Sequence, residues 1–360
     1  MTNYLLAGGG TAGHVNPLLA VAEYIRAEEP NAKILALGTV EGLESRLVPE
    51  RGFELRTIAR LPFPRKLNAY AMSFPMQFSK AVRQVEQLIR DENIDVVVGF
   101  GGYASAPAYE AARKTRTPIV VHEANALPGM ANRRAAKYAN ASGVAFENAP
   151  VHHAQFVGMP LRPEIEALAT SRDAAAARKH FGLKPDVVTL LVTGGSLGAK
   201  RINDTIEASR KALSAAGVQV LHIVGSRSEL PEVSEPGYSR IAYCDRMDLA
   251  IAAADIAVAR AGASTVSEFS AIGLPAIYIP YAVGNGEQAK NAKTVVDAGG
   301  AVLVADANFT ADYVQSVVIP LVSSTKQIKS MAAAAKSVGV IDGTKRLFEL
   351  VQSVLKPTRA

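Results

Sequence analysis

Residues 8–17 read GGGTAGHVNP and place a histidine, His14, directly after a glycine-rich run. Glycines allow backbone N–H groups to approach an oxygen-rich ligand, and the following helix directs its positive dipole end to the same place. A neutral imidazole, whose ordinary pKa is about 6.5, can take a proton from a hydroxyl that attacks carbon or phosphorus. His14 is therefore a candidate general base. The alternative is a histidine that caps or packs against the start of the helix.

A second group of candidate residues lies in ARAGASTVSEFS, residues 259–270. Ser264 and Thr265 are helix-capping residue types, and the free N–H groups of a helix start suit an anion such as a diphosphate. Glu268 lies about one turn deeper, where its carboxylate would repel phosphate but could accept hydrogen bonds from a ribose diol. The alternative is a capping box formed by Thr265 and Glu268.

Several common sites are disfavoured by the residues that surround the glycines. The pattern G-x-G-x-x-G occurs at residues 8–13, but the first carboxylate beyond the second expected strand, ILALGT, is Glu41, whereas an NAD site needs an acidic residue at the strand end. Residues 194–200, GGSLGAK, lack the Lys and Ser/Thr of a Walker loop. The single cysteine, Cys244, excludes an internal disulfide and a C-x-x-C site, and it fits a reducing compartment.

The elements expected to position these residues alternate along the chain. Short runs such as YLLAG, AKILALG, DVVVGF and PIVVHE alternate with helical patterns, which predicts an α/β fold of doubly wound parallel sheets. LLAGGGTAG at residues 5–13 matches LLVTGGSLG at 190–198, and DVVVGFGGYAS at 95–105 matches DIAVARAGAST at 255–265. This internal repeat predicts two Rossmann-like units. It also places an alanine opposite His14, so the turn itself does not require a histidine.

The break between the two halves is expected near GMPLRPE, residues 158–164, where a glycine and two prolines interrupt the pattern. We therefore predict a first domain over 1–160 and a second over 161–342. A helix over about 343–355 is expected to cross back and pack on the first domain. Ligands of such sheets bind beyond the carboxyl ends of the strands, so a cleft between the halves is the expected site.

The net charge of +6 is concentrated in one segment, because residues 56–90 carry seven Lys and Arg against one Glu. Aromatic and methionine side chains are interleaved with these cations, a combination that suits an anionic membrane surface. The candidate membrane patch comprises Arg65, Lys66, Phe74, Phe78 and Lys80. The alternative is that the apolar side chains pack on their own domain. Nucleic acid is disfavoured because no nucleic-acid-binding motif accompanies the patch. No apolar stretch is long enough to span a bilayer and no secretory signal is recognisable, so membrane contact is expected to be peripheral.

The motifs GGGTAGHVNP, GFGGYAS, PIVVHEAN, VTGGSLGA and ARAGASTVSE with EQAKNA resemble, in order and spacing, those of the MurG family. These are undecaprenyl-diphospho-muramoylpentapeptide β-N-acetylglucosaminyltransferases, which form lipid II in bacterial peptidoglycan synthesis, and the similarity runs from residue 5 to about residue 300. The resemblance implies the GT-B architecture, in which two Rossmann-like domains face each other across a cleft. It further implies a peripheral location at the cytoplasmic face of the membrane and a role in cell shape and division.

The resemblance also implies roles for individual residues. It assigns the donor, UDP-N-acetylglucosamine, mainly to residues around the second glycine loop and helix start: Arg162, Ser196, Cys244, Ala263, Ser264, Thr265, Val266, Ser267, Glu268 and Gln288. From the first half it adds donor contacts at Thr11, Ala12, Gly13 and Asn125, and it assigns Gly10, Gly101, Gly102 and Tyr103 to loops for the acceptor and its diphosphate. The sequence departs from the family pattern at Ala12 and Ala124, often Gly and Gln, at Cys244, often aliphatic, and at Glu287, often His.

The implied reaction is inverting transfer, in which the 4-hydroxyl of lipid-linked N-acetylmuramic acid attacks C1 of N-acetylglucosamine while UDP departs. His14 is the implied base, with Glu123 as support or as a rival base. No cofactor or structural metal is expected, since no Asp-x-Asp pattern is present. Expected partners are the two substrates, anionic inner-leaflet lipids and the cell-wall synthesis machinery. Two alternatives stay open: another GT-B enzyme, such as a diacylglycerol glycosyltransferase or a UDP-sugar epimerase, or a non-catalytic scaffold that binds sugar nucleotides.

Overall fold

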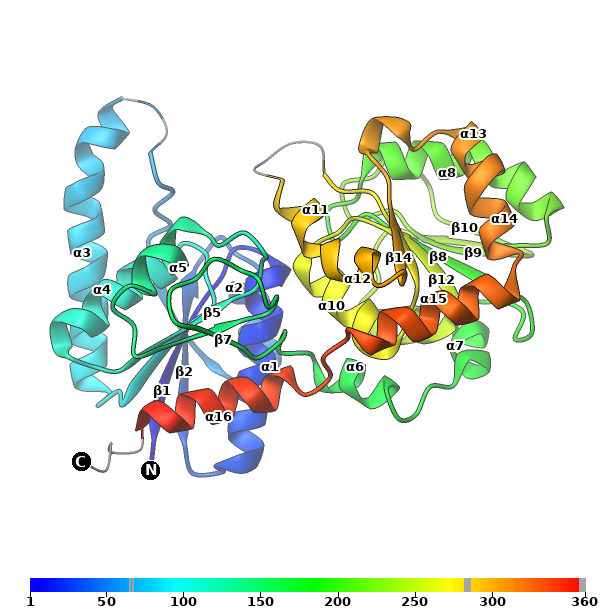
Figure 1. Ribbon diagram of the computed structural model, residues 1–360. Helices are drawn as coiled ribbons and strands as arrows, with labels where there is room; N and C mark the ends of the chain where they lie inside the picture. The colour runs from blue at the N-terminus through cyan, green and yellow to red at the C-terminus, as the bar shows by residue number, and fades with distance from the viewer. Residues whose placement is uncertain (65, 67, 282–285, 356–360) are drawn as a thin grey trace. The chain divides into compact units, whose positions relative to one another are not determined.

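The computed structural model describes residues 1–64, 66, 68–281 and 286–355 and divides the chain into two compact units. The first unit consists of Met1–Arg162 together with the segment that begins at Asp342, and the second consists of Pro163–Ile341. The division falls within the expected break at 158–164. Each unit is an α/β sandwich around its own sheet (Figure 1).

The first unit has a sheet in which every pairing among the described strands is parallel. Its order is β3 (Glu54–Ile58), β2 (Lys33–Thr39), β1 (Asn3–Ala7), β4 (Val96–Gly99), β5 (Ile119–Glu123), β6 (Ala141–Val144) and β7 (Ala154–Phe156). The helices of this unit are α1 (Ala12–Glu28), α2 (Glu44–Glu50), α3 (Ala69–Asp91), α4 (Ser105–Thr115), α5 (Met130–Ala135) and α16 (Gly343–Leu355). A central strand followed by a helix start therefore repeats at β1–α1 and β4–α4.

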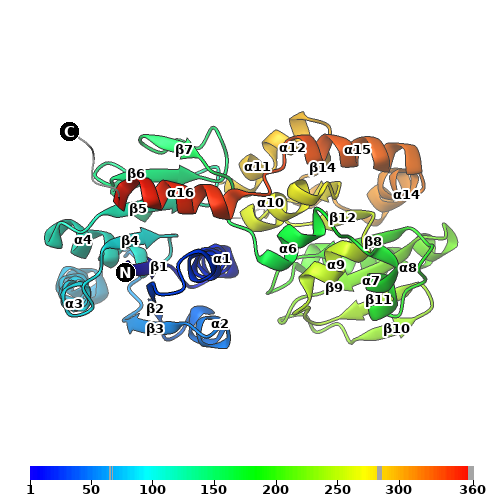
Figure 2. The same ribbon diagram turned by 90° about the horizontal axis from the view of Figure 1, so that it is seen from below.

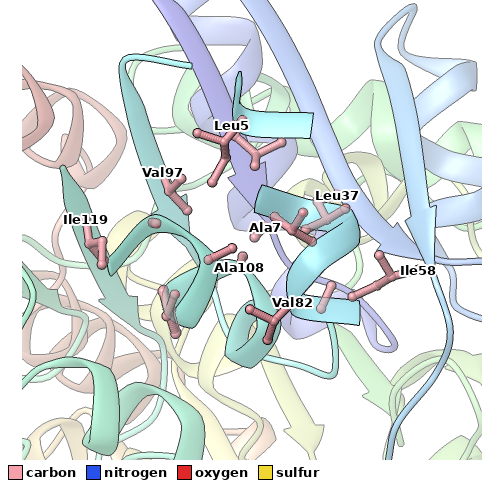
Figure 3. Close-up of a cluster of buried hydrophobic side chains, with 14 of the residues drawn as sticks. Leu5, Ala7, Leu37, Ile58, Val82, Val97, Ala108 and Ile119 are labelled. Carbon is pink, nitrogen blue, oxygen red and sulfur yellow. The ribbon is translucent and has the colours of Figure 1, made fainter. Parts of the chain in front are cut away.

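Alternate residues of β1 point to opposite faces of the sheet, as the period of a strand requires. Leu5 packs with side chains such as Val82 of α3 and Ala108 of α4, a cluster shown in Figure 3. Tyr4 and Leu6 enter the cluster on the other face, which α1 and α16 cover. The sheet is thus buried on both faces, and this explains its nearly continuous apolar strands.

The last helix, α16, completes the first unit (Figure 2). Leu347 and Val351 are fully buried in the core beside α1. Gln352 Nε2 donates to the Tyr4 hydroxyl at 2.7 Å and to a carboxylate oxygen of Glu29 at 2.7 Å. The final described helix is therefore tied to the first strand of the same unit.

The second unit repeats the same plan with one departure. Its sheet has the order β10 (Val233–Glu235), β11 (Tyr238–Ile241), β9 (Gln219–Ile223), β8 (Thr189–Thr193), β12 (Ile256–Ala259), β13 (Ala276–Tyr278) and β14 (Ala301–Leu303). All of these pairings are parallel except that of β10 with β11, which is antiparallel. The prediction of a parallel doubly wound sheet is thus confirmed for all but this edge strand.

Helices flank this second sheet. They are α6 (Pro163–Leu168), α7 (Ala174–His180), α8 (Lys200–Ala215), α9 (Met247–Ala253), α10 (Ala263–Ile272), α11 (Glu287–Asn291), α12 (Lys293–Asp297), α13 (Ala311–Tyr313), α14 (Ile319–Val322) and α15 (Thr325–Ser337), with a 3₁₀ turn at Asp306–Asn308 and a π-helical turn at Val314–Val318. Of these, α8, α14 and the π-helical turn between α13 and α14 contribute side chains to the main apolar core of the unit. Within the described ranges, no helix combines the length and the apolar character needed to cross a bilayer.

Candidate active site

His14 lies in the first turn of α1, where the glycine loop after β1 ends. Its Nδ1 atom is 3.0 Å from the carbonyl oxygen of Gly9 and 3.4 Å from the hydroxyl of Thr11. A carbonyl only accepts hydrogen bonds, so Nδ1 is the donor to Gly9, and in the neutral form of the ring Nε2 is the nitrogen that carries the lone pair. The half-buried ring is therefore anchored at one nitrogen and suited at the other to remove a proton.

The helix start beside His14 also presents free donors. Thr11 is the exposed N-cap residue, and its side chain forms no capping hydrogen bond. Ala12 and Gly13 are the first helical residues, so their N–H groups have no acceptor within the helix. The positions predicted to meet the donor are thus placed where an anion or a polar sugar could be bound.

The loop after β4 packs against the first glycine loop. Gly102 has φ +83°, and a Cβ there would lie only 2.4 Å from the Gly9 carbonyl oxygen, so this close approach requires glycine. A Cβ at Gly101 would lie 3.1 Å from His14 Nε2 and would crowd the candidate base. Tyr103 lies beside Gly10 and under the guanidinium of Arg60, which is 4.9 Å from the ring centre. The structure therefore brings the predicted acceptor loops together with His14.

Glu123 ends β5 and is almost fully buried. Its Oε1 accepts hydrogen bonds from the Asn125 backbone N–H at 2.8 Å and side-chain Nδ2 at 3.4 Å. Its Oε2 accepts from the Gly129 N–H and from Asn132 Nδ2, each at 3.0 Å. Both oxygens are engaged in holding the loop that carries Asn125, an arrangement that favours support over the role of a base.

A buried polar layer extends from Glu123 and was not anticipated from the sequence. Asn132 Nδ2 also donates to the His122 carbonyl at 3.0 Å, and Asn132 Oδ1 accepts from the Tyr109 hydroxyl at 2.8 Å. Burial raises the pKa of Tyr109 well above its usual value, and burial lowers the pKa of His122 to about 4. Both side chains are therefore neutral at physiological pH, and the Tyr109 hydroxyl helps to hold Asn132 in place.

In the second unit, the helix predicted to grip a diphosphate begins slightly earlier than Ser264 and Thr265 suggest. The N-cap is Gly262, and α10 starts at Ala263, so Ser264 and Thr265 occupy its first turn and are not capping residues. A glycine N-cap cannot form the reciprocal side-chain bonds of a capping box. The N–H groups of Ala263, Ser264 and Thr265 precede the first intrahelical bond, which Val266 makes to the Gly262 carbonyl.

The side chains around this helix start are largely enclosed. The Ser264 hydroxyl is buried, and within the described residues it has no hydrogen-bond partner. Glu268 is nearly buried one turn further along, whereas Ser267 is half-exposed.

Ser196 is exposed in the loop before α8, and its carbonyl accepts from the Ser226 N–H at 2.9 Å. Arg162 is the last residue of the first unit and directly precedes α6.

Gln288 lies on α11 with one end of its amide already engaged. Its Oε1 accepts the Tyr281 N–H at 2.9 Å, so its NH₂ group is the end suited to donate to a sugar hydroxyl. Asn291 Nδ2 contacts the Ala261 carbonyl at 3.3 Å and ties α11 to the loop before α10. Glu287 is the first residue of α11.

Cys244 is buried and lines an open cavity of about 670 Å³ in the second unit. The other walls come from the end of α7, from β10 and β11, and from the segment 243–246. Among the described residues of this lining, Cys244 is the only one that the resemblance assigns to the nucleotide. Ser264 and Glu268 are not among the described lining residues of this cavity.

The candidate membrane patch divides into buried and exposed parts. Arg65 lies outside the described residues, while Lys66 and Lys80 are exposed. Phe74 and Phe78 are half-buried and pack against the core of the first unit, with ring centres 5.8 Å apart. The highly exposed apolar side chains nearby are instead Phe63, Met72 and Met76, at 62%, 86% and 72% exposure. We call these three residues the apolar ridge.

Comparisons with known proteins agree with this geometry. Residues 4–144 match the glycosyltransferase family 28 N-terminal domain, and residues 189–347 match the family 28 C-terminal domain. A protein of Leifsonia xyli subsp. xyli named UDP-N-acetylglucosamine–N-acetylmuramyl-(pentapeptide) pyrophosphoryl-undecaprenol N-acetylglucosamine transferase is 58% identical over 355 residues, which cover 99% of both chains. A Streptomyces coelicolor protein of the same name is 45% identical and covers 98% of both chains.

Among solved structures, Acinetobacter baumannii MurG matches with a TM-score of 0.78 at 24% identity, covering 98% of this chain and all of that one. A UDP-GlcNAc 2-epimerase from Neisseria meningitidis matches with a TM-score of 0.69 at 14% identity, covering 98% of this chain and all of that one. Both likenesses show the shared fold. The full-length relatives go further and confirm the resemblance read from the motifs: the chain belongs to the MurG family of UDP-N-acetylglucosamine–N-acetylmuramyl-(pentapeptide) pyrophosphoryl-undecaprenol N-acetylglucosamine transferases.

Proposed function

We propose that this protein transfers N-acetylglucosamine from UDP-N-acetylglucosamine to the 4-hydroxyl of undecaprenyl-linked N-acetylmuramoyl-pentapeptide, forming lipid II for peptidoglycan synthesis. The observation that carries the proposal is the similarity, at 58% identity along 99% of both chains, to a protein named for this activity. The geometry of His14 supports it, because an imidazole anchored through Nδ1 can use Nε2 to accept the proton of a hydroxyl.

In the proposed reaction, His14 Nε2 takes the proton of the acceptor 4-hydroxyl as its oxygen forms the new bond to C1 of the sugar. The bond from C1 to the UDP oxygen breaks, and the configuration at C1 inverts. Negative charge builds on the departing diphosphate, where N–H groups at the start of α10 would stabilise it. Glu268 would bind the ribose, and the Gln288 amide would donate to the sugar.

The transfer is further proposed to proceed without a bound metal ion. The helix N–H groups supply the positive potential that a cation would otherwise provide. Activity that survives treatment with EDTA and is unchanged by added Mg²⁺ would support this part of the proposal. A loss restored by Mg²⁺ would contradict it.

The test uses the full chain with radiolabelled UDP-N-acetylglucosamine and a lipid-linked muramoyl-pentapeptide. We expect a labelled disaccharide lipid and equimolar UDP. UDP-N-acetylmannosamine as product would indicate an epimerase, and nucleotide binding without turnover would indicate a scaffold. Replacing His14 by Ala should lower kcat by about 10²- to 10⁴-fold while the KM for the nucleotide sugar stays within about twofold. Retained turnover would remove His14 from the mechanism.

We also propose that the protein meets its acceptor at the cytoplasmic face of the cell membrane, alongside the cell-wall synthesis machinery. The apolar ridge would enter the lipid interface while Lys66 and Lys80 meet anionic headgroups. Replacing the three ridge residues by Ser should weaken binding to anionic vesicles by at least about tenfold, because tenfold corresponds to about 1.4 kcal/mol and full burial of even one large apolar side chain is worth roughly 1.5–3 kcal/mol. Val40→Ser, at a similarly exposed position, serves as the control.

A further inference from the structure

One buried carboxylate of the first unit has no role in the reaction as described so far. Glu44 is the first residue of α2 and is 1% exposed. Its Oε1 accepts hydrogen bonds from the Thr39 N–H at 2.8 Å and from the Thr39 hydroxyl at 2.9 Å. Its Oε2 accepts the N–H of Gly10 at 2.7 Å. The side chain thus joins the end of β2 to the loop that precedes His14.

The surrounding chain is shaped to admit this carboxylate. A Cβ at Gly9, Gly38 or Gly42 would lie 2.2, 2.3 or 2.0 Å from an atom of the Glu44 side chain. Two backbone segments, the loop after β1 and the stretch from the end of β2 to α2, therefore approach the carboxyl group at distances that only glycine allows. A buried carboxylate is tolerated where its oxygens are hydrogen-bonded, and here each oxygen has at least one donor.

The bond to Gly10 connects Glu44 to His14 through a single peptide group. The N–H of Gly10 and the C=O of Gly9 belong to the same peptide bond. Glu44 accepts from the nitrogen end of that peptide, and the oxygen end lies 3.0 Å from His14 Nδ1. Hydrogen bonds in such a chain polarise one another, so the carboxylate strengthens the Gly9 carbonyl as an acceptor.

We infer that Glu44 is a positioning residue for the reaction proposed above: through the Gly9–Gly10 peptide it fixes the orientation and tautomer of His14. With the proton held on Nδ1, the lone pair of Nε2 is kept for the acceptor hydroxyl. The arrangement is a relay in which a carboxylate orients an imidazole, with a backbone peptide placed between them. Glu44 itself does not touch the imidazole, and the inference concerns positioning alone.

The decisive variant is Glu44→Gln, which keeps the size of the side chain but offers only one accepting oxygen. Either the Gly10 N–H or the Thr39 donors then lose their acceptor. We expect kcat to fall roughly 10- to 100-fold, the range found when a partner that orients a metal-ligating histidine is lost. The KM for UDP-N-acetylglucosamine should stay within about twofold, because the proposed nucleotide residues lie mainly in the second unit.

Two further variants separate positioning from general stability. Thr39→Val removes one donor to the same carboxylate and leaves the Gly10 bond intact, so it should cost stability but lower kcat less than about threefold. Glu50→Gln, at an exposed position on the same helix, should change neither. Equal losses of kcat in Glu44→Gln and Thr39→Val would overturn the inference.

A spectroscopic measurement tests the relay without an activity assay. In protein labelled with ¹⁵N-histidine, the His14 resonances, assigned by their loss in His14→Ala, should report a neutral ring protonated at Nδ1. Glu44→Gln should shift this signal toward a mixture of tautomers. A wild-type ring protonated at Nε2, or an unchanged tautomer in the variant, would refute the inference. Wild-type protein that shows the expected tautomer but no transfer would instead refute the proposed function.

Discussion

Glu123→Ala is expected to lower the free energy of unfolding of the first unit. The carboxylate accepts hydrogen bonds from the backbone of Asn125 and Gly129 and from the Asn132 amide. A buried donor left without an acceptor costs about 1–3 kcal/mol. Gly129 is exposed, so water can replace the carboxylate there, and the cost comes from the donors of Asn125 and Asn132. The expected loss in free energy of unfolding is therefore roughly 2–6 kcal/mol for the first unit.

The assay is urea unfolding of the full chain at pH 7.5, followed by circular dichroism and fitted with one transition for each unit. Glu123→Gln keeps one accepting oxygen but turns an NH₂ group toward a donor, so an intermediate loss is expected. His14→Ala, half-buried and bonded at one nitrogen, should stay within about 1 kcal/mol of wild type. If Glu123→Gln unfolds like wild type but loses about 10³-fold in kcat at unchanged KM, Glu123 is the base and this reasoning is refuted.

Three other substitutions give separate expectations. Gly102→Ala places a Cβ 2.4 Å from the Gly9 carbonyl at a φ of +83°, so a melting curve should show a loss of about 1–3 kcal/mol; an unchanged melting temperature would contradict the close packing. Leu347→Ala, at a fully buried position of α16, should lower the free energy of unfolding of the first unit by about 2–5 kcal/mol and leave the urea transition of the second unit unchanged. Burial lowers the pKa of His222 to about 3, so the neutral ring stabilises the second unit fully above a pH of about 6.5. This stability is lost as the pH falls toward 3, by up to about 1.4 kcal/mol for each pH unit. His222→Asn should flatten that slope between pH 7 and 5, and an equal slope in both proteins would contradict the assignment.

The parts of the site that depend on local sequence were predictable. A glycine loop between a buried strand and a helix places His14 at the carboxyl edge of a parallel sheet by geometry alone. The internal repeat identified the second loop by the same rule. Ser264 and Thr265 were predicted as capping residues of α10, but the N-cap is Gly262, two residues before Ser264. Gly262 adopts the extended conformation of an N-cap without a capping side chain.

The parts that depend on tertiary contact were not predictable. Glu44 and the exposed Glu50 are the first and last residues of the same short helix, and the residue type alone does not show that Glu44 is the buried one. Its role appears when the loop that carries Gly9 and Gly10 packs against the segment that carries Gly38, Gly42 and Glu44. Likewise Asn132 meets Tyr109 and Glu123 through the folding of different elements.

One missed feature did carry a local signal. The dipeptide Pro236–Gly237 separates the short segments VSE and YSRI and marks a tight hairpin, in which Gly237 adopts φ +81°. The strands on either side are β10 and β11, the antiparallel pair at the edge of the second sheet. Phe74 and Phe78 carried no such local signal. A helical pattern does not distinguish an aromatic side chain that faces the core, as these two do, from one that faces a bilayer.

The return of α16 to the first unit has a consequence for the order in which a growing chain can fold. The second unit is one continuous stretch of chain, Pro163–Ile341, whereas the core of the first unit includes Leu347, Leu350 and Val351 from α16. During synthesis on the ribosome, all core residues of the second unit are made before α16 is. The first unit cannot complete its core until α16 has left the exit tunnel. A fragment that stops at Arg162 should therefore be a poor substitute for the native first unit, and supplying α16 in trans should help it to close.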